Sequence, residues 1–397
     1  MWLEIIIFSI IGIIAGTFTG LFPGIHINLV AASLLAFSVI LLQYFSPLII
    51  AVFVVSMAIT HTFLDVLPAI FLGVPEEETA LSVLPGHEML LKGRGYEAVR
   101  LTVIGSIFGI FIIIFILPFY LYFLPKYYEF LSKIMAYILI AVSAFLILRD
   151  EKKFFAFFLF MLSGILGIFT LNFYAIKQPL FPLLGGLFGT SLLAISFMKK
   201  VKIPKQNFRI QRKVQGIPSV LFSSIISGAL VSFLPGLGAS QGAVIGSSIT
   251  KLNRKSFLVL IGAISTITMG LGFVALYTIS KPRHGAAVVV GKFLENFSLM
   301  HLLLFISIML FVSGFAVFLT LALAKFFAKK IYKLNYSRIS LVMIVFITLL
   351  SIIISGWYSL LILLIGTSIG ILASILGIRK MHLMGCLIVP VILLFLL

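Results

Sequence analysis

Residues 13–31 have the sequence IIAGTFTGLFPGIHINLVA, and residues 225–243 have the sequence IISGALVSFLPGLGASQGA. The two segments align without gaps and are identical at six positions, among them a Pro-Gly pair at 23–24 and 235–236. In both copies this pair interrupts a long apolar run, and each copy opens one half of the chain. The sequence therefore predicts two related halves, each with a broken or re-entrant helix at the corresponding position.

Composition indicates that lipid surrounds most of this chain. Of 397 residues, 62% are hydrophobic and 10% are charged, and the mean hydropathy is +1.27, whereas soluble domains carry about 25% charged residues. About twelve apolar blocks, such as 101–124 and 131–148, approach the roughly 20 residues that cross a bilayer. They are continuously apolar, unlike the alternating strands of membrane barrels. We therefore expect an all-α, polytopic transmembrane helical bundle in the cell membrane.

Charge suggests how the chain is organised. The net charge of +18 would suggest nucleic-acid binding in a soluble protein, but these basic residues lie between apolar blocks, which is typical of cytoplasmic loops. The densest basic cluster lies within 199–213, where anionic lipid headgroups suit it better than nucleic acid. We expect a first transmembrane repeat at 1–198, a basic cytoplasmic linker at 199–216 and a second repeat at 217–397. If each half has an odd number of crossings, the repeats are inverted.

The Pro-Gly breaks predict a binding site. Proline removes a backbone donor, and a break inside the bilayer frees polar groups that lipid cannot satisfy, so the break must face protein or a watery cavity. A helix that resumes after the break points its N-terminal amides at that cavity and favours an anion there. The alternative is that each pair only kinks a tightly packed helix. The substrate-binding residues expected at the breaks are Pro23, Gly24, His26, Asn28, Pro235, Gly236, Ser240 and Gln241.

Ionisable residues follow each break. In the first half Asp65 lies inside an apolar block, where a carboxylate is costly and often functional, and Glu76 and Glu77 begin an acidic run. We expect these three to carry the coupling ion. In the second half Lys281, Arg283 and His284 are the expected contacts of an anionic substrate. The alternatives are a structural hydrogen bond for Asp65, a solvated helix start for the glutamates and ordinary loop charges for the basic residues.

Three stretches together resemble a known family: GTFTGLFPGIHINLVAA, GVPEEETALSVLPGHEMLLKGRGYEAVRLTVIGSIFG and SGALVSFLPGLGASQGAVIG. They look like the large membrane subunit of tripartite tricarboxylate transporters, the TctA family. The resemblance implies a secondary carrier for small organic anions, driven by a cation gradient, with a small membrane subunit and an extracytoplasmic binding protein as partners. The acidic run at 76–78 and the basic run at 281–284 depart from the family pattern. We therefore expect a short, divergent branch of archaeal type, whose substrate need not be a tricarboxylate.

Two other functions stay open. A flippase for a polyprenyl-phosphate lipid carrier would use paired re-entrant segments and nearby charges equally well. An intramembrane enzyme is less favoured, because His87-Glu88 lacks the second histidine of a zinc protease helix and Gly291-Lys292 lacks the Ser or Thr of a phosphate loop. The six histidines include no close metal-ligand pair. We expect no enzymatic activity, no metal and no cofactor, and we expect residues 299–397 to act as scaffold.

Overall fold

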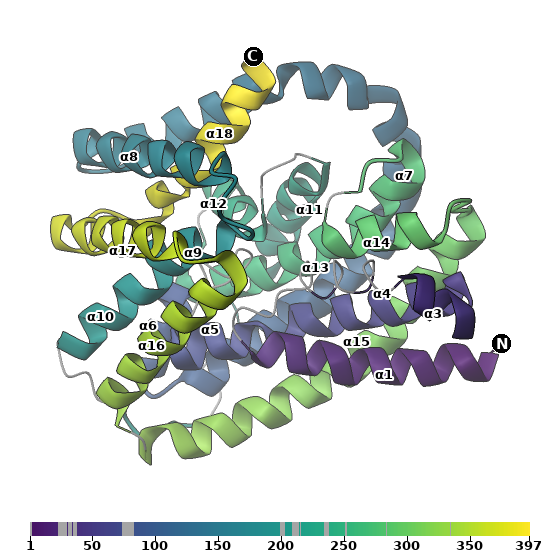
Figure 1. Ribbon diagram of the computed structural model, residues 1–397, viewed down its shortest axis with the longest axis horizontal. Coiled ribbons are helices and arrows are strands. Elements are labelled where there is room, and N and C mark those ends of the chain that lie inside the picture. The colour runs from purple at the N-terminus through teal and green to yellow at the C-terminus, as the bar shows by residue number, and fades with distance from the viewer. Residues whose placement is uncertain are drawn as a thin grey trace.

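A computed structural model shows a protein built of helices, with no strand among the residues that it describes (Figure 1). Nine helical stretches in this part of the chain are long and apolar enough to cross a membrane. The predicted all-α polytopic bundle is therefore confirmed. The structure describes the whole chain except residues 1, 23–29, 31–33, 35–37, 74–82, 199–202, 209–213, 215, 234–237, 251, 283 and 334.

The helices follow one another along the chain on either side of residues 199–216. Up to residue 198 they are α1 (Trp2–Leu21), α3 (Ser38–Tyr44), α4 (Pro47–Leu64), α5 (Val66–Leu72), α6 (Val83–Leu91), α7 (Gly95–Leu148), α8 (Lys153–Leu171), α9 (Leu180–Leu184), the π-helix η1 (Gly185–Thr190) and α10 (Ser191–Met198). After residue 216 they are α11 (Ile217–Phe233), α12 (Ala239–Ile249), α13 (Arg254–Ile279), α14 (Gly285–Phe293), α15 (Leu299–Lys330), the 3-10 turn η2 (Ile331–Lys333), α16 (Tyr336–Ser355), α17 (Ser359–Leu376), the 3-10 turn η3 (Lys380–Met384) and α18 (Gly385–Leu396).

Local sequence explains where the central helices begin and end. The side chain of Asn253 accepts a hydrogen bond from the backbone N–H of Ser256 (2.9 Å) and so caps the start of α13. Ser280 ends α13 in the left-handed region, with φ of 53°. At α15, Ser298 and His301 form a reciprocal capping box. Pro47 stands at the start of α4, where its missing N–H costs nothing.

Helix α7 differs from the sequence prediction. The blocks at 101–124 and 131–148 were expected as separate crossings, but the structure joins them in one helix of 54 residues. A straight helix of that length would extend about 80 Å, against about 30 Å of hydrocarbon. Pro118 and Pro125 lie inside it, and proline bends a helix without ending it when neighbours satisfy the freed carbonyls. In Figure 1 the helix curves over the top of the molecule.

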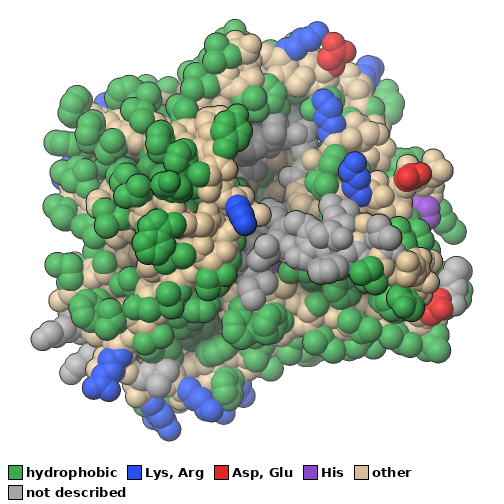
Figure 2. Space-filling view, in the orientation of Figure 1, with side chains coloured by type: hydrophobic (Ala, Val, Ile, Leu, Met, Phe, Trp, Pro, Cys, Tyr) green, Lys and Arg blue, Asp and Glu red, His purple; other side chains and the backbone are tan. Residues whose placement is uncertain are grey.

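Two helices form the centre. The most apolar windows of α13 and of the α4–α5 segment have 89% and 83% of their residues buried, against 17% for α16. Large apolar side chains such as Phe318 and Ile353 are exposed on the outer helices, and hydrophobic side chains cover much of the face in Figure 2. Such a surface suits lipid. Helices α4 and α13 therefore form the centre of the described bundle.

The two central helices receive partners in a crosswise pattern. The long helix α7 packs along α13, and the long helix α15 packs along α4. Glycines permit the first contact: a methyl group added to Gly109 would lie 2.7 Å from the carbonyl oxygen of Ala263, and one added to Gly105 would overlap the backbone of Val259. Ser106 Oγ also donates to the carbonyl of Gly262 (3.2 Å). Small residues commonly allow such close approach between membrane helices.

A second bundle lies beside this centre. Helix α8 packs against α18, α17 packs against the π-helix, and α10 packs against α16. In Figure 1 these helices gather on the left, while α1, α4, α7 and α13–α15 occupy the rest of the molecule. Elements from before residue 198 and after residue 299 interleave here, so the bundle joins the two ends of the chain.

Candidate functional site

The end of α1 lies against the end of α4, at the point where the first Pro-Gly pair follows in the sequence. Glycines 12, 16 and 20 of α1 face α4, and a methyl group on Gly20 would lie 2.8 Å from Leu64 Cβ and 3.2 Å from the Asp65 nitrogen. One turn earlier, His61 Nδ1 lies 3.1 Å from Thr19 Oγ1, and both residues are buried. The close approach of α1 therefore brings its C-terminal end next to two ionisable residues, His61 and Asp65.

Asp65 occupies the junction between α4 and α5. Its backbone N–H donates to the carbonyl of His61 (2.9 Å), and its backbone stays in the right-handed helical region. Pro68 explains the junction, because it has no N–H to offer the carbonyl of Leu64, four residues earlier. Only 2% of Asp65 is exposed. A proline-induced junction thus holds a carboxylate deep inside the protein, as the sequence predicted for an intramembrane acid.

The second break has a comparable border. Helix α11 ends before it and α12 begins after it, and both pack on α13. Ser240 is completely buried near the start of α12. Close packing continues along α12, where a methyl group on Gly242 would lie 2.8 Å from Val231 of α11 and 3.0 Å from Ile264 of α13. The described helices that flank the Pro-Gly pairs, α1 for the first and α11 and α12 for the second, therefore pack on a central helix. Of these contacts, the one between α1 and α4 includes the ionisable residues His61 and Asp65.

His284 and Lys281, two predicted substrate contacts, each interact with other parts of the protein. The Nδ1 atom of His284 accepts from the N–H of Ala287 (3.2 Å) and caps α14, while Nε2 lies 2.9 Å from the carbonyl of Met269, to which it donates. This pattern gives a neutral imidazole that fastens α14 to α13. The ammonium of Lys281 lies 4.9 Å from the ring centre of Tyr128 on α7, a cation–π contact at the surface.

Most of the predicted site residues lie outside the part of the chain that the structure describes. They are Pro23, Gly24, His26, Asn28, Glu76, Glu77, Pro235, Gly236 and Arg283. Gln241 belongs to α12, but its side chain is likewise outside the description. Their roles stay predictions.

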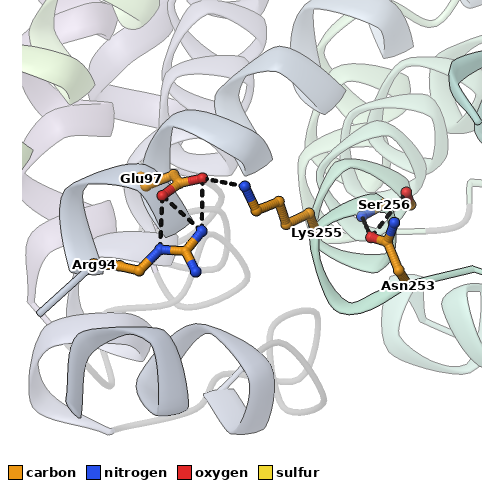
Figure 3. A network of polar contacts seen from close by, with 5 residues as sticks. All are labelled: Arg94, Glu97, Asn253, Lys255 and Ser256. Atoms are coloured by element: carbon orange, nitrogen blue, oxygen red, sulfur yellow. Dashed lines mark hydrogen bonds and ion pairs between the residues drawn. The ribbon is translucent and has the colours of Figure 1, made fainter. Parts of the chain in front are cut away.

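A network that sequence reasoning missed joins α7 to α13 (Figure 3). The guanidinium of Arg94 donates to both carboxylate oxygens of Glu97, from Nε (2.8 Å) and from a terminal nitrogen (2.9 Å). The Lys255 ammonium lies 2.7 Å from the same carboxylate. On the neighbouring helix, Glu88 pairs with Arg254. Two acids from before the linker thus meet two cations at the start of α13, and bidentate pairing makes the Arg94–Glu97 contact directional.

The described part of the predicted linker, residues 199–216, is fastened to the same end. The side-chain oxygen of Gln206 accepts from the N–H of Gly95 (2.8 Å), and its amide nitrogen donates to the carbonyl of Leu90 (3.1 Å). The N–H of Asn207 donates to the carbonyl of Gly93 (2.7 Å). Gly93 has φ of +75°, which only glycine adopts cheaply. The described part of the linker is therefore fixed where α6 turns into α7.

The C-terminal bundle contains a second buried polar group. His382 Nε2 lies 3.0 Å from Asp150 Oδ2, and Lys380 donates to Ser191 Oγ (2.9 Å). Asp150 lies in the turn between α7 and α8, outside the spanning helices. Burial alone raises the pKa of its carboxyl, but hydrogen bonds from His382 and the Lys152 amide outweigh that effect and hold the pKa below its usual value. In the described part of the chain, no group of three His, Cys, Asp or Glu residues is arranged to hold a metal.

Comparisons with known proteins fit this arrangement. The model of the tripartite tricarboxylate transporter TctA family matches residues 6–385. An uncharacterized protein of Methanocaldococcus jannaschii is 32% identical over 403 residues, which cover 98% of this chain and 99% of the relative. No solved structure matches the chain. The chain therefore belongs to the tripartite tricarboxylate transporter TctA family and is a multi-pass membrane transporter.

Proposed function

We propose that this protein is a secondary active transporter for a small organic anion of the carboxylate class, coupled to a proton or another cation. The substrate would bind at the interface of two broken-helix repeats. The observation that carries the proposal is the crosswise packing of α7 on α13 and of α15 on α4, with the helices that flank the Pro-Gly pairs, α1, α11 and α12, packed on these central helices. Carriers of this architecture bind substrate near the midplane, between repeats.

The order of helices supports two repeats, at 1–198 and 217–397, joined by the linker at 199–216. In each half a helix before the break (α1 or α11) packs on a buried helix after it (α4 or α13). A short helix and then a long one follow in both halves, namely α6 and α7 in the first, α14 and α15 in the second. The crosswise contacts are those expected if a pseudo-twofold axis relates the halves.

Charge supports an anionic substrate. The first half contains the buried Asp65, and the second half contains the basic run with Lys281 and Arg283. In this proposal the basic run attracts the anion, and Asp65, with Glu76 and Glu77, carries the coupling ion. His284 serves to hold α14 on α13 unless its hydrogen bond to the carbonyl of Met269 opens during transport.

The ion pairs of Figure 3 support alternating access. They tie the starts of α7 and α13 together, and Gln206 fastens the linker to that same end. Because the linker is rich in basic residues, we assign this end to the cytoplasm. A carrier that opens there must separate Glu97 from Lys255.

The name of the family further supports two partner proteins, which we propose to be a small membrane subunit and an extracytoplasmic binding protein.

Ligand-induced stabilisation of the purified protein in detergent tests the proposal. The panel comprises citrate, smaller carboxylates, inorganic phosphate and a short-chain polyprenyl phosphate. A ligand at a hundred times its dissociation constant stabilises the folded state by about 2.7 kcal/mol. We expect stabilisation by a carboxylate that disappears in Arg283→Ala and persists in Lys329→Ala, which removes an exposed lysine from the end of α15. Stabilisation by the polyprenyl phosphate alone would instead favour a flippase, and no response to any carboxylate would reject the substrate class.

A further inference from the structure

Three basic residues, Arg379, Lys380 and His382, lie in or directly before the turn η3. Two of them, Arg379 and His382, form ion pairs with the carboxylate of Asp150. His382 lies 3.0 Å from the Asp150 carboxylate, and Arg379 lies 4.0 Å from it. Arg379 is exposed, whereas His382 is buried. Lys380 stands between them in the sequence but points the other way, toward the start of α10. The carboxylate of this cluster is therefore already engaged on the side away from Lys380.

Lys380 is a buried amine with very little to bind. It is 6% exposed, and its ammonium nitrogen donates to Ser191 Oγ (2.9 Å). Ser191 itself donates to the carbonyl of Leu187 (2.7 Å), so its oxygen acts only as acceptor toward the lysine. An ammonium has three hydrogens to donate. No carboxylate in the described part of the chain forms an ion pair with Lys380, and burial without a counter-charge disfavours the charged form.

Lys380 lies between a π-helix and helix α12. Ser191 directly follows the π-helix Gly185–Thr190, and π-helices of one turn occur frequently at functional sites. Thr190 shares a hydroxyl hydrogen bond with Thr367 of α17 beside it. On the other side η3 touches α12, the helix that follows the second Pro-Gly break. Lys380 thus lies in the turn that connects the C-terminal bundle to the broken helix of the second half.

We propose that Lys380 is a proton-binding site: its amine takes up one proton from water to form the ammonium, and gives it back when α12 moves against η3. The inference rests on the proposed function, to which it adds a second protonation site besides the coupling site at Asp65, Glu76 and Glu77. In this proposal the protonation of Lys380 follows the position of α12.

The chemistry around Lys380 suits reversible protonation. Burial without an adjacent carboxylate among the described residues favours the neutral amine of Lys380 over the ammonium. Arg379 directly precedes η3 and His382 lies within it, and both lie within 4.0 Å of the Asp150 carboxylate. Of the helices packed against η3, α8 carries Lys153 at its start and α18 carries Cys386. Helices α10, α12 and α17 bring no ionisable group in their described residues. A movement of α12 that wets or dries Lys380 would therefore change its protonation directly.

The pH dependence of thermal unfolding tests the titration without any substrate. Because burial disfavours the ammonium, the unfolded chain holds this proton to a higher pH than the folded protein does, and stability rises with pH up to the ordinary lysine value. We expect the Tm of the wild type to rise relative to Lys380→Met between pH 7 and pH 10. The exposed-lysine control, Lys329→Met, should keep a constant difference from the wild type. A wild-type minus Lys380→Met difference that does not change with pH would overturn the proposal.

Two further measurements test the proposal independently of whether Lys380→Met folds or a substrate is known. If Lys380→Met does not fold, Ser191→Ala should move the midpoint of the wild-type pH profile to lower pH, because it removes the acceptor of the ammonium; an unmoved midpoint would contradict the site. Hydrogen exchange of residues 239–249, scaled for intrinsic pH dependence, should differ between wild type and Lys380→Met at pH 7 and converge at pH 9.5. Equal exchange at both values would reject the link to α12. Neither experiment uses a substrate, so their outcome does not depend on the proposed substrate class, which the ligand panel tests by itself.

Discussion

Helices α4 and α13 are the two most buried membrane helices described here, and they differ in chemistry. Helix α4 carries His61 and ends at Asp65, both buried. Helix α13 has no acidic, basic or imidazole side chain after Lys255 at its start. Each nevertheless packs against a helix that precedes a Pro-Gly pair, α1 or α11, and against a long helix from the other side of residues 199–216, α15 or α7. The packing is therefore similar around the two helices, whereas the buried ionisable groups lie on α4 and at its end. This one-sided charge agrees with the proposed coupling site at Asp65.

The largest expected effect comes from filling the seam between α7 and α13. Gly105→Val would push a side chain into the backbone of Val259, and overpacking between two rigid helices costs about 3 kcal/mol or more. We expect loss of the monodisperse peak in detergent. Gly314→Ala on α15 is the matched control, because nothing lies within 4 Å of the added methyl group. Normal behaviour of Gly105→Val would show that this seam does not hold the centre together.

The next effect concerns the ion pairs at the start of the two helices. Glu97→Gln leaves Arg94 and Lys255 facing a neutral amide, and breaking a buried pair costs several kcal/mol. Both cations are partly exposed, at 25% and 22%, so solvent screening reduces the expected loss to about 2 kcal/mol. Thermal unfolding in detergent measures it.

Helix α7 supplies the control for that measurement. Glu129 and Lys133 form an ion pair at 2.9 Å with both side chains largely exposed, so Glu129→Gln should leave the Tm unchanged. If the two substitutions had equal effects, the network of Figure 3 would be an ordinary surface feature and would not bind the halves.

The smallest effect lies at the end of α11. Tyr120 of α7 shares a hydrogen bond of 2.6 Å with Ser232, close to the second break. Tyr120→Phe should cost about 1 kcal/mol, the typical net value of a buried hydrogen bond. Tyr122→Phe, on an exposed side chain of the same helix, should cost nothing measurable. A double-mutant cycle with Ser232→Ala measures the interaction energy of this pair. If the effects of the two substitutions are fully additive, the hydrogen bond between Tyr120 and Ser232 contributes no stability.

Sequence patterns predicted the broad architecture because hydrophobic length is a strong signal in membranes. Continuous apolar blocks fixed the helical class, and the acid at Asp65 stood out because its neighbours are apolar. The merging of 101–124 with 131–148 was not predictable, since Pro118 and Pro125 look like helix ends until tertiary contacts preserve the helix. The same context decides whether a proline ends α4 early, as Pro68 does.

The sites were harder to predict than the helices. Glu97 and Lys255 lie 158 positions apart in the numbering, and only folding shows that the starts of α7 and α13 meet. From the sequence, Lys380 is expected in an exposed loop, because it follows Arg379 between two apolar blocks. Its burial depends on how η3 turns against α10, which no local pattern records. His284 was predicted as a substrate contact from its neighbours, whereas its described hydrogen bonds go to the backbone.

Uptake of radiolabelled carboxylates into proteoliposomes tests the central claim most directly, with an inward proton or sodium gradient and with each gradient collapsed. The account predicts gradient-driven accumulation of at least one carboxylate by the wild type, loss of accumulation but retained counterflow in Asp65→Asn, and loss of both in Arg283→Ala. Accumulation that is unaffected by Asp65→Asn and Arg283→Ala would contradict the one-sided placement of ion and anion at the interface of the two halves.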